Sequence, residues 1–398
     1  MDESGLTQQP KKQKLNEELY IVDRNIKCLH NLPEEILRYI LSLLPTRDAI
    51  RTSILCKRWE YLWTSIPNLD FGKMDHDKPD KRILFMNYVE RVLLLRDSTD
   101  IKRFSLSCQV LYDASHVSAW ISTAVRRNVQ KLYLTLYHFE EPFSLPHSLF
   151  KCVTLTELEL EIYGIPKLPP TVCFTNLKSL IIRYVTFSNE YLTQKLFSGL
   201  PVLEELELEY CNWVNIKVVS ISAPKLLYIG ITEDTENQND EKGCQVMISG
   251  VNLNVFYYFG EFYNEYRVYN SSSLVNATIV VGWSLQRQRQ VAHRMYVLLT
   301  GLYRVKELIL ADCALKVWGL LFDLINEEAG RDIGSGIGRI VTVDCKAISF
   351  DQARFLRVQV EMPLDKPIQR GACTGQGIEY GSPFNTNDSW DYVSTVDS

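Results

Sequence analysis

The stretch "LPVLEELELEYC", residues 200–211, contains the alternation that decides the fold. Leu203, Leu206 and Leu208 are apolar, and glutamates separate them. Strict alternation of apolar and polar residues over about four to eight positions is typical of a strand that buries one face. The stretch therefore predicts a short strand whose leucines point into a core and whose glutamates point outward.

The same pattern recurs along the chain on both sides of this stretch. It consists of an apolar residue, two variable residues, an apolar residue, one variable residue and a third apolar residue. Strong copies are Ile101-Phe104-Leu106, Val129-Leu132-Leu134, Leu155-Leu158-Leu160, Leu177-Leu180-Ile182, Leu203-Leu206-Leu208 and Leu226-Ile229-Ile231; weaker copies are Leu253-Phe256-Tyr258, Leu274-Ala277-Ile279 and Val305-Leu308-Leu310. The central positions step by 21 to 31 residues. Because one such unit cannot bury its own apolar face, we expect stacked units in an α/β solenoid with a parallel sheet on its concave face.

Positions between the apolar ones are the candidates for binding a target. The acidic members, such as Glu157, Glu161, Glu205 and Glu209, either attract a basic target or only keep the strand faces solvated. The residues that we select as candidate target-binding positions are Glu159, Arg183, Tyr184 and Glu207, together with Tyr258 from an aromatic segment of the repeats.

Two further segments of the repeat region are open to two interpretations. "TEDTENQNDEKG", Thr232 to Gly243, is a polar insertion that is either a binding loop or a plain connection. "FYYFGEFYNEY", Phe256 to Tyr266, is either an aromatic contact patch or late-repeat core.

A second decisive stretch, "NLPEEILRYILSLLPTRDAIRTSILCKRWEYLW", occupies residues 31–63. Pro33 suits the first turn of a helix that ends before Pro45, and Thr46 is a candidate cap for a second helix through Ile54. Trp59, Leu62 and Trp63 have the i, i+3, i+4 spacing of a third helix. A unit this small cannot bury all of its apolar residues, so part of this surface should meet a partner or the rest of the chain.

These two regions resemble a known family. The stretch from Leu32 to Trp63 resembles an F-box of the form common in plants, with Cys56 where that family usually has serine. "FTNLKSLIIRYVTF" and "APKLLYIGI" are similar to the irregular leucine-rich repeats of plant F-box/FBD proteins.

The resemblance implies a three-helix F-box that docks on a Skp-type adaptor, and through it on a cullin and a RING protein, while the repeats hold an unknown target protein for ubiquitination. The positions that it implies for adaptor binding are Leu32, Pro33, Ile36, Ile40, Leu43, Leu44, Trp59, Leu62 and Trp63. The alternative is a non-catalytic interaction scaffold, or a decayed chimeric F-box protein without ligase function.

The C-terminal region breaks the repeat. "RFLRVQVEMPLDKPIQRG", within Arg331 to Gly371, resembles a segment of retroelement-derived zinc-knuckle proteins, but no knuckle follows and Cys373 stands alone. Gly334, Gly336 and Gly338 have neither the strand before them nor the lysine after them that a phosphate-binding loop needs.

Composition excludes several other classes. The net charge is −5, which argues against a broad nucleic-acid-binding face. The sequence contains no membrane span, no signal peptide and no close pair of cysteines, and the residues form no catalytic pattern, so we expect no metal, no cofactor and no enzyme activity. "PKKQK", Pro10 to Lys14, is either a nuclear import signal or a solvated tail, so we expect a protein of the nucleus, the cytoplasm or both.

The domain boundaries that we expect follow from these segments. They are a polar disordered tail at 1–26, the F-box at 27–72, a linker and helix at 73–100, the repeats at 101–328, an atypical segment at 329–371 and a disordered tail at 372–398.

Overall fold

The computed structural model describes residues 32–72, 79–110, 114–138, 143–233, 243–270, 272–281, 288–302, 305–311, 339–344 and 355–361. The expected tails at 1–26 and 372–398, the stretch Pro10 to Lys14 and the glycines Gly334, Gly336 and Gly338 lie outside these residues. Most of the insertion from Thr232 to Gly243 lies outside them as well.

The N-terminal unit is helical and leads into the first strand of the sheet. Its elements are α2 (Glu34–Ser42), α3 (Thr46–Arg51), the 3₁₀ turns η1 (Thr52–Ile54) and η2 (Leu62–Ser65), β1 (Asn68–Phe71) and α4 (Pro79–Leu95). Pro33 caps α2, and Glu34 and Glu35 place negative charge at the positive end of its dipole.

Two local expectations differ from what the structure contains. The segment with Trp59, Leu62 and Trp63 forms turns and η2 in place of a third α-helix. Pro45 is the residue that caps α3, while the buried Thr46 hydroxyl accepts a hydrogen bond from the backbone N–H of Asp70 at 2.7 Å. Thr46 therefore ties the helices to β1.

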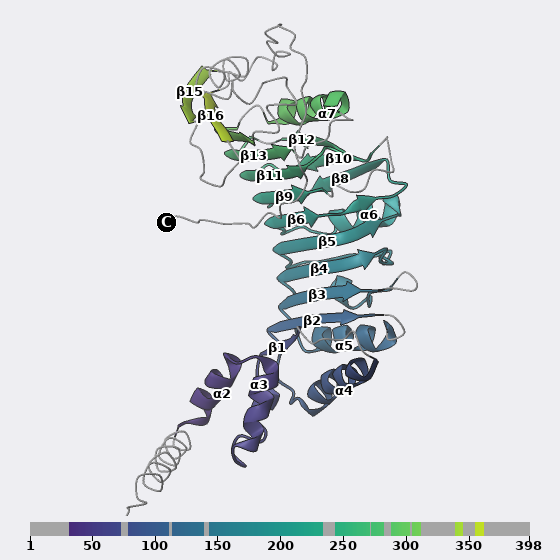
Figure 1. The fold of residues 1–398 in the computed structure, drawn as a ribbon, viewed down its shortest axis with the longest axis vertical. Helices are drawn as coiled ribbons and strands as arrows, with labels where there is room; N and C mark the ends of the chain where they lie inside the picture. The colour runs from purple at the N-terminus through teal and green to yellow at the C-terminus, as the bar shows by residue number, and fades with distance from the viewer. Residues whose placement is uncertain are drawn as a thin grey trace, which may run out of the picture.

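The repeat region is built on one large sheet, whose strands stack along the molecule in chain order (Figure 1). The strands after β1 are β2 (Arg103–Gln109), β3 (Lys131–Tyr137), β4 (Glu157–Gly164), β5 (Ser179–Phe187), β6 (Glu205–Glu209), β9 (Tyr228–Thr232), β11 (Val255–Gly260), β13 (Asn276–Val281) and β14 (Glu307–Ala311). All of these neighbours pair in parallel.

The register confirms the repeat read from the sequence. The central apolar positions of all nine copies face one another in a single row across the sheet: Phe104, Leu132, Leu158, Leu180, Leu206, Ile229, Phe256, Ala277 and Leu308. Each of these side chains is buried.

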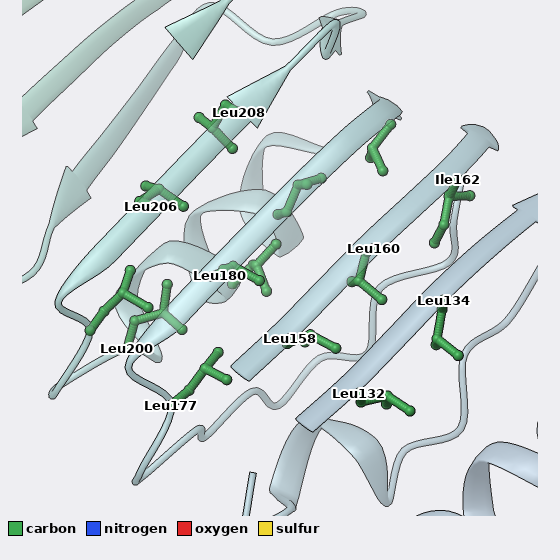
Figure 2. Packing of buried hydrophobic residues seen from close by; sticks show 14 of the residues in the cluster. Leu132, Leu134, Leu158, Leu160, Ile162, Leu177, Leu180, Leu200, Leu206 and Leu208 are labelled. Atoms are coloured by element: carbon green, nitrogen blue, oxygen red, sulfur yellow. The ribbon is translucent and has the colours of Figure 1, made fainter. Parts of the chain in front are cut away.

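The core lies between the sheet and the return segments (Figure 2). Leucines of neighbouring strands form a row in it, which we call the leucine ladder: Leu132, Leu134, Leu158, Leu160, Leu180, Leu206 and Leu208. Leu180 and Ile182 of β5 lie between Leu158 and Leu160 of β4 on one side and Leu206 and Leu208 of β6 on the other. Leu177 lies in the turn before β5. Each fully buried leucine of this kind contributes about 1.5–3 kcal/mol through removal of its surface from water. Stacking therefore supplies the stability that no single repeat has.

The return segments vary from repeat to repeat. They include α5 (Ala114–Arg126), η3 (Leu149–Lys151), α6 (Glu190–Ser198), α7 (Gln288–Gly301) and the strands β7 (Asn212–Trp213), β8 (Val218–Ser222), β10 (Gln245–Ser249) and β12 (Glu265–Tyr269). Strands β8, β10 and β12 form a second parallel sheet, which the sequence reading did not predict. Helix α6 begins at Asn189, whose side chain accepts a hydrogen bond from the N–H of Leu192 at 2.9 Å.

The C-terminal segment joins the far edge of the large sheet with the opposite strand direction. Strand β16 (Phe355–Glu361) pairs antiparallel with β14, and β15 (Arg339–Asp344) pairs antiparallel with β16. Because an uncovered sheet edge is a template for aggregation, this pairing protects the last parallel strand. The break in the repeat that the sequence indicated thus coincides with a change of strand direction.

Candidate functional site

Helix α2 divides its apolar residues between an inner and an outer side. Leu37 and Leu41 are fully buried and face the core. Ile36 and Leu43 are 45% and 67% exposed, and Ile40 is half-buried. The helix is therefore apolar on both sides, although only one side is covered within the described part of the chain.

The outer side of α2 is one part of a larger group of exposed apolar side chains in the N-terminal unit. Seven large apolar or aromatic side chains between residues 36 and 61 are exposed; we call them the N-terminal apolar surface, and they are Ile36, Tyr39, Leu43, Leu44, Ile54, Leu55 and Tyr61. Ile54, on η1, is 85% exposed. Exposed apolar residues in such number on a small unit are typical of a surface that binds another protein.

Three expected anchor residues lie elsewhere. Trp59, Leu62 and Trp63 are buried in the core cluster, so they do not contribute to an exposed surface. The reason is that turns and η2 replace a third helix and direct these side chains inward. Leu32 is half-buried against the same core, while Pro33 is exposed at the start of α2.

The N-terminal unit is fastened to the repeat sheet. Strand β1 pairs in parallel with β2, and the backbone N–H of Lys102 donates to the carbonyl of Pro67 at 2.8 Å. The buried guanidinium of Arg96 donates to the carbonyls of Ile66 and Asp100. The β1–β2 pairing and the Lys102–Pro67 bond cross between the two regions, Arg96 fixes the chain between α4 and β2 against Ile66, and the core cluster runs through both regions.

A second candidate surface is the outward side of β4, β5 and β6. Arg183 on β5 bridges two neighbouring strands: its Nε contacts Glu209 on β6 at 2.7 Å, and its Nη1 contacts Glu159 on β4. Burial opposes the charge of Arg183, but Glu209 and Glu159 outweigh burial and raise its pKa. Glu159 and Arg183, both selected from the sequence, therefore lie together.

Glu207 lies beside this ion-pair network but outside it. Burial, together with the neighbouring Glu209, raises the pKa of Glu207 to about 7, although Arg183 acts in the opposite direction. Tyr184, at the end of the same surface, stacks between Tyr163 and Tyr210. Four of the five selected target-binding positions thus lie on the outward side of β4 to β6.

Tyr258 does not belong to this surface. It is fully buried, and its hydroxyl donates to the carboxylate of Glu233 at 2.6 Å. Burial and the charge of Glu233 raise the pKa of Tyr258 well above its usual value. Phe256, Phe262 and Tyr266 of the same segment are buried too, which favours the late-repeat core over a contact patch.

The described residues offer no obvious site for a metal ion. Among them, no three or more histidine, cysteine, aspartate or glutamate side chains gather in a group that could hold one. Within the same part of the chain, no helix has both the length and the apolar character needed to cross a bilayer.

Comparison with known families assigns both regions. Residues 29–71 match the F-box domain, and residues 117–243 match the family described as "FBD-associated F-box protein At5g56370, LRR repeats". The chain belongs with the F-box/leucine-rich-repeat proteins. The N-terminal apolar surface is therefore a surface of the F-box, and the outward side of β4 to β6 belongs to the leucine-rich repeats.

Individual relatives agree with this assignment. The chain is 33% identical over 218 residues to the F-box/FBD/LRR-repeat protein At5g56420 of Arabidopsis thaliana, 35% over 205 residues to the FBD-associated F-box protein At5g56370, and 32% over 257 residues to the F-box/LRR-repeat protein At4g14103 of the same plant. These alignments cover 54%, 50% and 63% of this chain, and 51%, 48% and 66% of the three relatives.

Sequence reasoning missed several residues of both surfaces. On the F-box, Tyr39 and Tyr61 were not selected, although both are large aromatic residues and both side chains are exposed. On the repeats, Tyr163 and Tyr210 were not selected. Their signal is visible in hindsight, because a tyrosine ends each of the strand segments "LELEIY", "LIIRY" and "LELEY".

Proposed function

We propose that this protein is the substrate-recognition subunit of an SCF-type cullin-RING ubiquitin ligase. The F-box docks on a Skp-type adaptor, the adaptor connects it to a cullin and a RING protein, and the repeats bind the target protein. The observation that carries the proposal is the N-terminal apolar surface, which lies within the segment that matches the F-box domain. Such a subunit acts in the nucleus or the cytoplasm and performs no chemistry itself.

The distribution of apolar residues favours docking over a purely structural role. Leu37, Leu41 and Trp59 supply the inner core, so Ile36 and Leu43 are not needed to hold the unit together. Short helices that present apolar side chains to a groove are a common mode of protein recognition. We propose that Pro33, Ile36, Ile40, Leu43 and Leu44 belong to the adaptor interface, together with Tyr39, Ile54, Leu55 and Tyr61.

The fastening of the F-box to the repeats suits a receptor that must present its target in a fixed position. The parallel pairing of β1 with β2 and the bond from Arg96 to the Ile66 carbonyl tie residues 66–71 to the start of the repeats. A target held on the repeats would keep its orientation toward the adaptor, which shortens the search for a lysine that can be modified.

Reconstitution tests the proposal and separates it from the scaffold alternative. The full chain is mixed with a panel of Skp-type adaptors and then with a cullin, a RING protein, a charged ubiquitin-conjugating enzyme and ubiquitin. We expect an adaptor-dependent complex that contains the cullin and supports ubiquitin transfer within the complex. A complex that holds the adaptor but excludes the cullin would favour the scaffold, and a folded chain that binds no adaptor would refute the proposal.

A further inference from the structure

Three tyrosines form a continuous stack at the carboxyl ends of β4, β5 and β6. We call Tyr163, Tyr184 and Tyr210 the tyrosine ladder. The ring centroids of Tyr163 and Tyr184 are 4.4 Å apart with planes inclined by 13°, and those of Tyr184 and Tyr210 are 5.0 Å apart with planes inclined by 14°. Tyr163, at one end of the stack, is 47% exposed.

The backbone is held in an unfavourable conformation to build this ladder. Tyr184 and Tyr210 have φ values of 57° and 54°, in the left-handed region that bulky residues rarely occupy. Each such residue costs about 1 kcal/mol or more and persists only when the surroundings impose it. The ladder is therefore a fixed feature of the surface.

The same side of the sheet already contains an arginine over a tyrosine ring, and the hydroxyl of that tyrosine reaches Glu157, whose ion-pair partner is Lys131 at 2.6 Å. The guanidinium of Arg103 lies 4.8 Å from the centroid of the Tyr133 ring. The Tyr133 hydroxyl donates to Glu157 at 2.9 Å. The face of a tyrosine ring and a nearby carboxylate together suit an arginine side chain, because the planar guanidinium stacks on the ring while its N–H groups donate to the carboxylate.

A second tyrosine–glutamate pair lies within β4 itself, whereas Tyr133 and Glu157 lie on neighbouring strands. The Tyr163 hydroxyl donates to Glu161 at 2.7 Å, and the Thr135 hydroxyl lies 3.4 Å from the other oxygen of Glu161. No lysine or arginine of the described residues forms an ion pair with Glu161 or lies over the Tyr163 ring. Within that part of the chain, the Tyr163 hydroxyl therefore donates to a carboxylate, as the Tyr133 hydroxyl does, but no cation lies over the Tyr163 ring.

The surroundings of the pair favour a positive ligand. The outward positions of β4 and β6 carry six glutamates, while Arg183 is the cation between them on β5. Glu205 and Glu207 form no ion pair with any described residue. The raised pKa of Glu207 reflects burial and this crowding of like charge, which an added cation would relieve.

We propose that the Tyr163–Glu161 pair binds an arginine side chain of a partner protein, and that the tyrosine ladder and the unpaired glutamates of β6 hold the basic segment around it. This inference deepens the proposed function, on which it rests, since it gives the chemistry of the target that the repeats recognise: a segment with an arginine and at least one further basic residue.

A peptide-binding measurement on the full chain tests the inference. The probes are fluorescent peptides of four Gly-Arg repeats, four Gly-Lys repeats and four Gly-Glu repeats, and the readout is anisotropy at low salt. We expect the Gly-Arg peptide to bind at least about 3-fold tighter than the Gly-Lys peptide, the Gly-Glu peptide not to bind, and added salt to weaken binding. Equal binding of the Gly-Arg and Gly-Lys peptides, or no binding of either, would overturn the inference.

Matched variants locate the site. Glu161→Gln should weaken binding of the Gly-Arg peptide at least about 5-fold, whereas Glu35→Gln, which removes the same charge from an exposed position of the F-box, should not. Tyr163→Leu should abolish the preference for arginine over lysine, while Tyr191→Leu should preserve it. Thermal denaturation establishes that each variant is folded. Unchanged binding in both Glu161→Gln and Tyr163→Leu would place any peptide binding elsewhere and contradict the inference.

Adaptor binding by the same proteins separates this inference from the proposed function. If Glu161→Gln and the parent chain bind a Skp-type adaptor equally while no chain binds the Gly-Arg peptide, the arginine site is wrong and the receptor role stands. If the peptide binds as expected and no adaptor binds, the arginine site stands and the ligase role is wrong.

Discussion

The buried carboxylate of Glu233 permits a prediction whose size can be worked out from its contacts. Glu233 is 4% exposed and follows β9 directly. One oxygen accepts hydrogen bonds from the backbone and the side chain of Asn264 and from the Tyr266 hydroxyl, at 2.9–3.0 Å. The other accepts from the Tyr258 hydroxyl and the N–H of Tyr263, at 2.6 and 2.8 Å. All five groups around Glu233 act as donors.

Replacing Glu233 by glutamine keeps the shape and removes one acceptor. The amide nitrogen would face at least two donors that have lost their partner. The Tyr258 hydroxyl already accepts from the N–H of Phe262, so it cannot easily turn to a new role. Each buried donor without a partner costs about 1–3 kcal/mol, so Glu233→Gln should lower the free energy of unfolding by about 2–5 kcal/mol.

Urea denaturation of the full chain, followed by circular dichroism, measures this loss. Glu205→Gln is the matched control, because Glu205 is exposed on the neighbouring strand β6, and its effect should stay within about 0.5 kcal/mol. A loss below about 1 kcal/mol for Glu233→Gln would refute the reasoning, because it would mean that the donors find other partners at little cost.

Three further predictions concern stability. Leu206→Ala removes a fully buried member of the leucine ladder and should cost about 3–5 kcal/mol in thermal or urea denaturation, whereas Leu227→Ala, at an exposed position, should cost less than about 1 kcal/mol; similar losses would contradict the ladder. Arg96→Met leaves two carbonyl groups without a donor and should cost about 2–4 kcal/mol in urea, compared with little change for the exposed Arg91→Met. The pKa of Glu207 is raised from 4.5 to about 7, so the folded protein binds more protons than the unfolded chain at pH values between these two. The stability that protonated Glu207 contributes is therefore full below pH 4.5 and is lost as the pH rises to about 7. In urea denaturation, Glu207→Gln should remove this loss of stability with pH and raise the free energy of unfolding by about 1–2 kcal/mol at about pH 8, but not at about pH 4. The same increase at both pH values would refute the assignment of the pH dependence to Glu207.

The repeat could be predicted from the sequence because its signal is local. The spacing around Leu206 occurs nine times, and each copy forms a strand in a common register. Alternation decides which side chains of a strand face the core, and the step between copies decides which strands are neighbours. Both follow from the chain itself, without knowledge of any long-range contact.

The surfaces were harder to predict because they depend on contacts between distant residues. Trp59 and Trp63 have the spacing of a helix, yet turns direct them into a core shared with Ile66 and Leu69. Tyr258 was selected because it lies in an aromatic segment, yet it is the third apolar position of its own repeat copy, in register with Ile231, and inside the core its hydroxyl meets Glu233, 25 residues earlier in the chain. The second sheet escaped prediction because its strands, such as β8, lie in return segments that carry no repeat.

The central claim is that the outer side of α2 docks an adaptor, and one affinity measurement tests it most directly. The parent chain, the double variant Ile36→Asp with Leu43→Lys, and the control Val153→Asp with Val251→Asp are titrated into a Skp-type adaptor that binds the parent, by calorimetry. All four positions are exposed, so each protein should remain folded, as denaturation curves will establish.

The account predicts that the α2 double variant binds at least about 100-fold more weakly than the parent, since each lost apolar contact is worth about 1.5–3 kcal/mol. The control on the repeats should bind as the parent does. Equal affinity of all three folded proteins would contradict the claim that this surface of the F-box docks the adaptor.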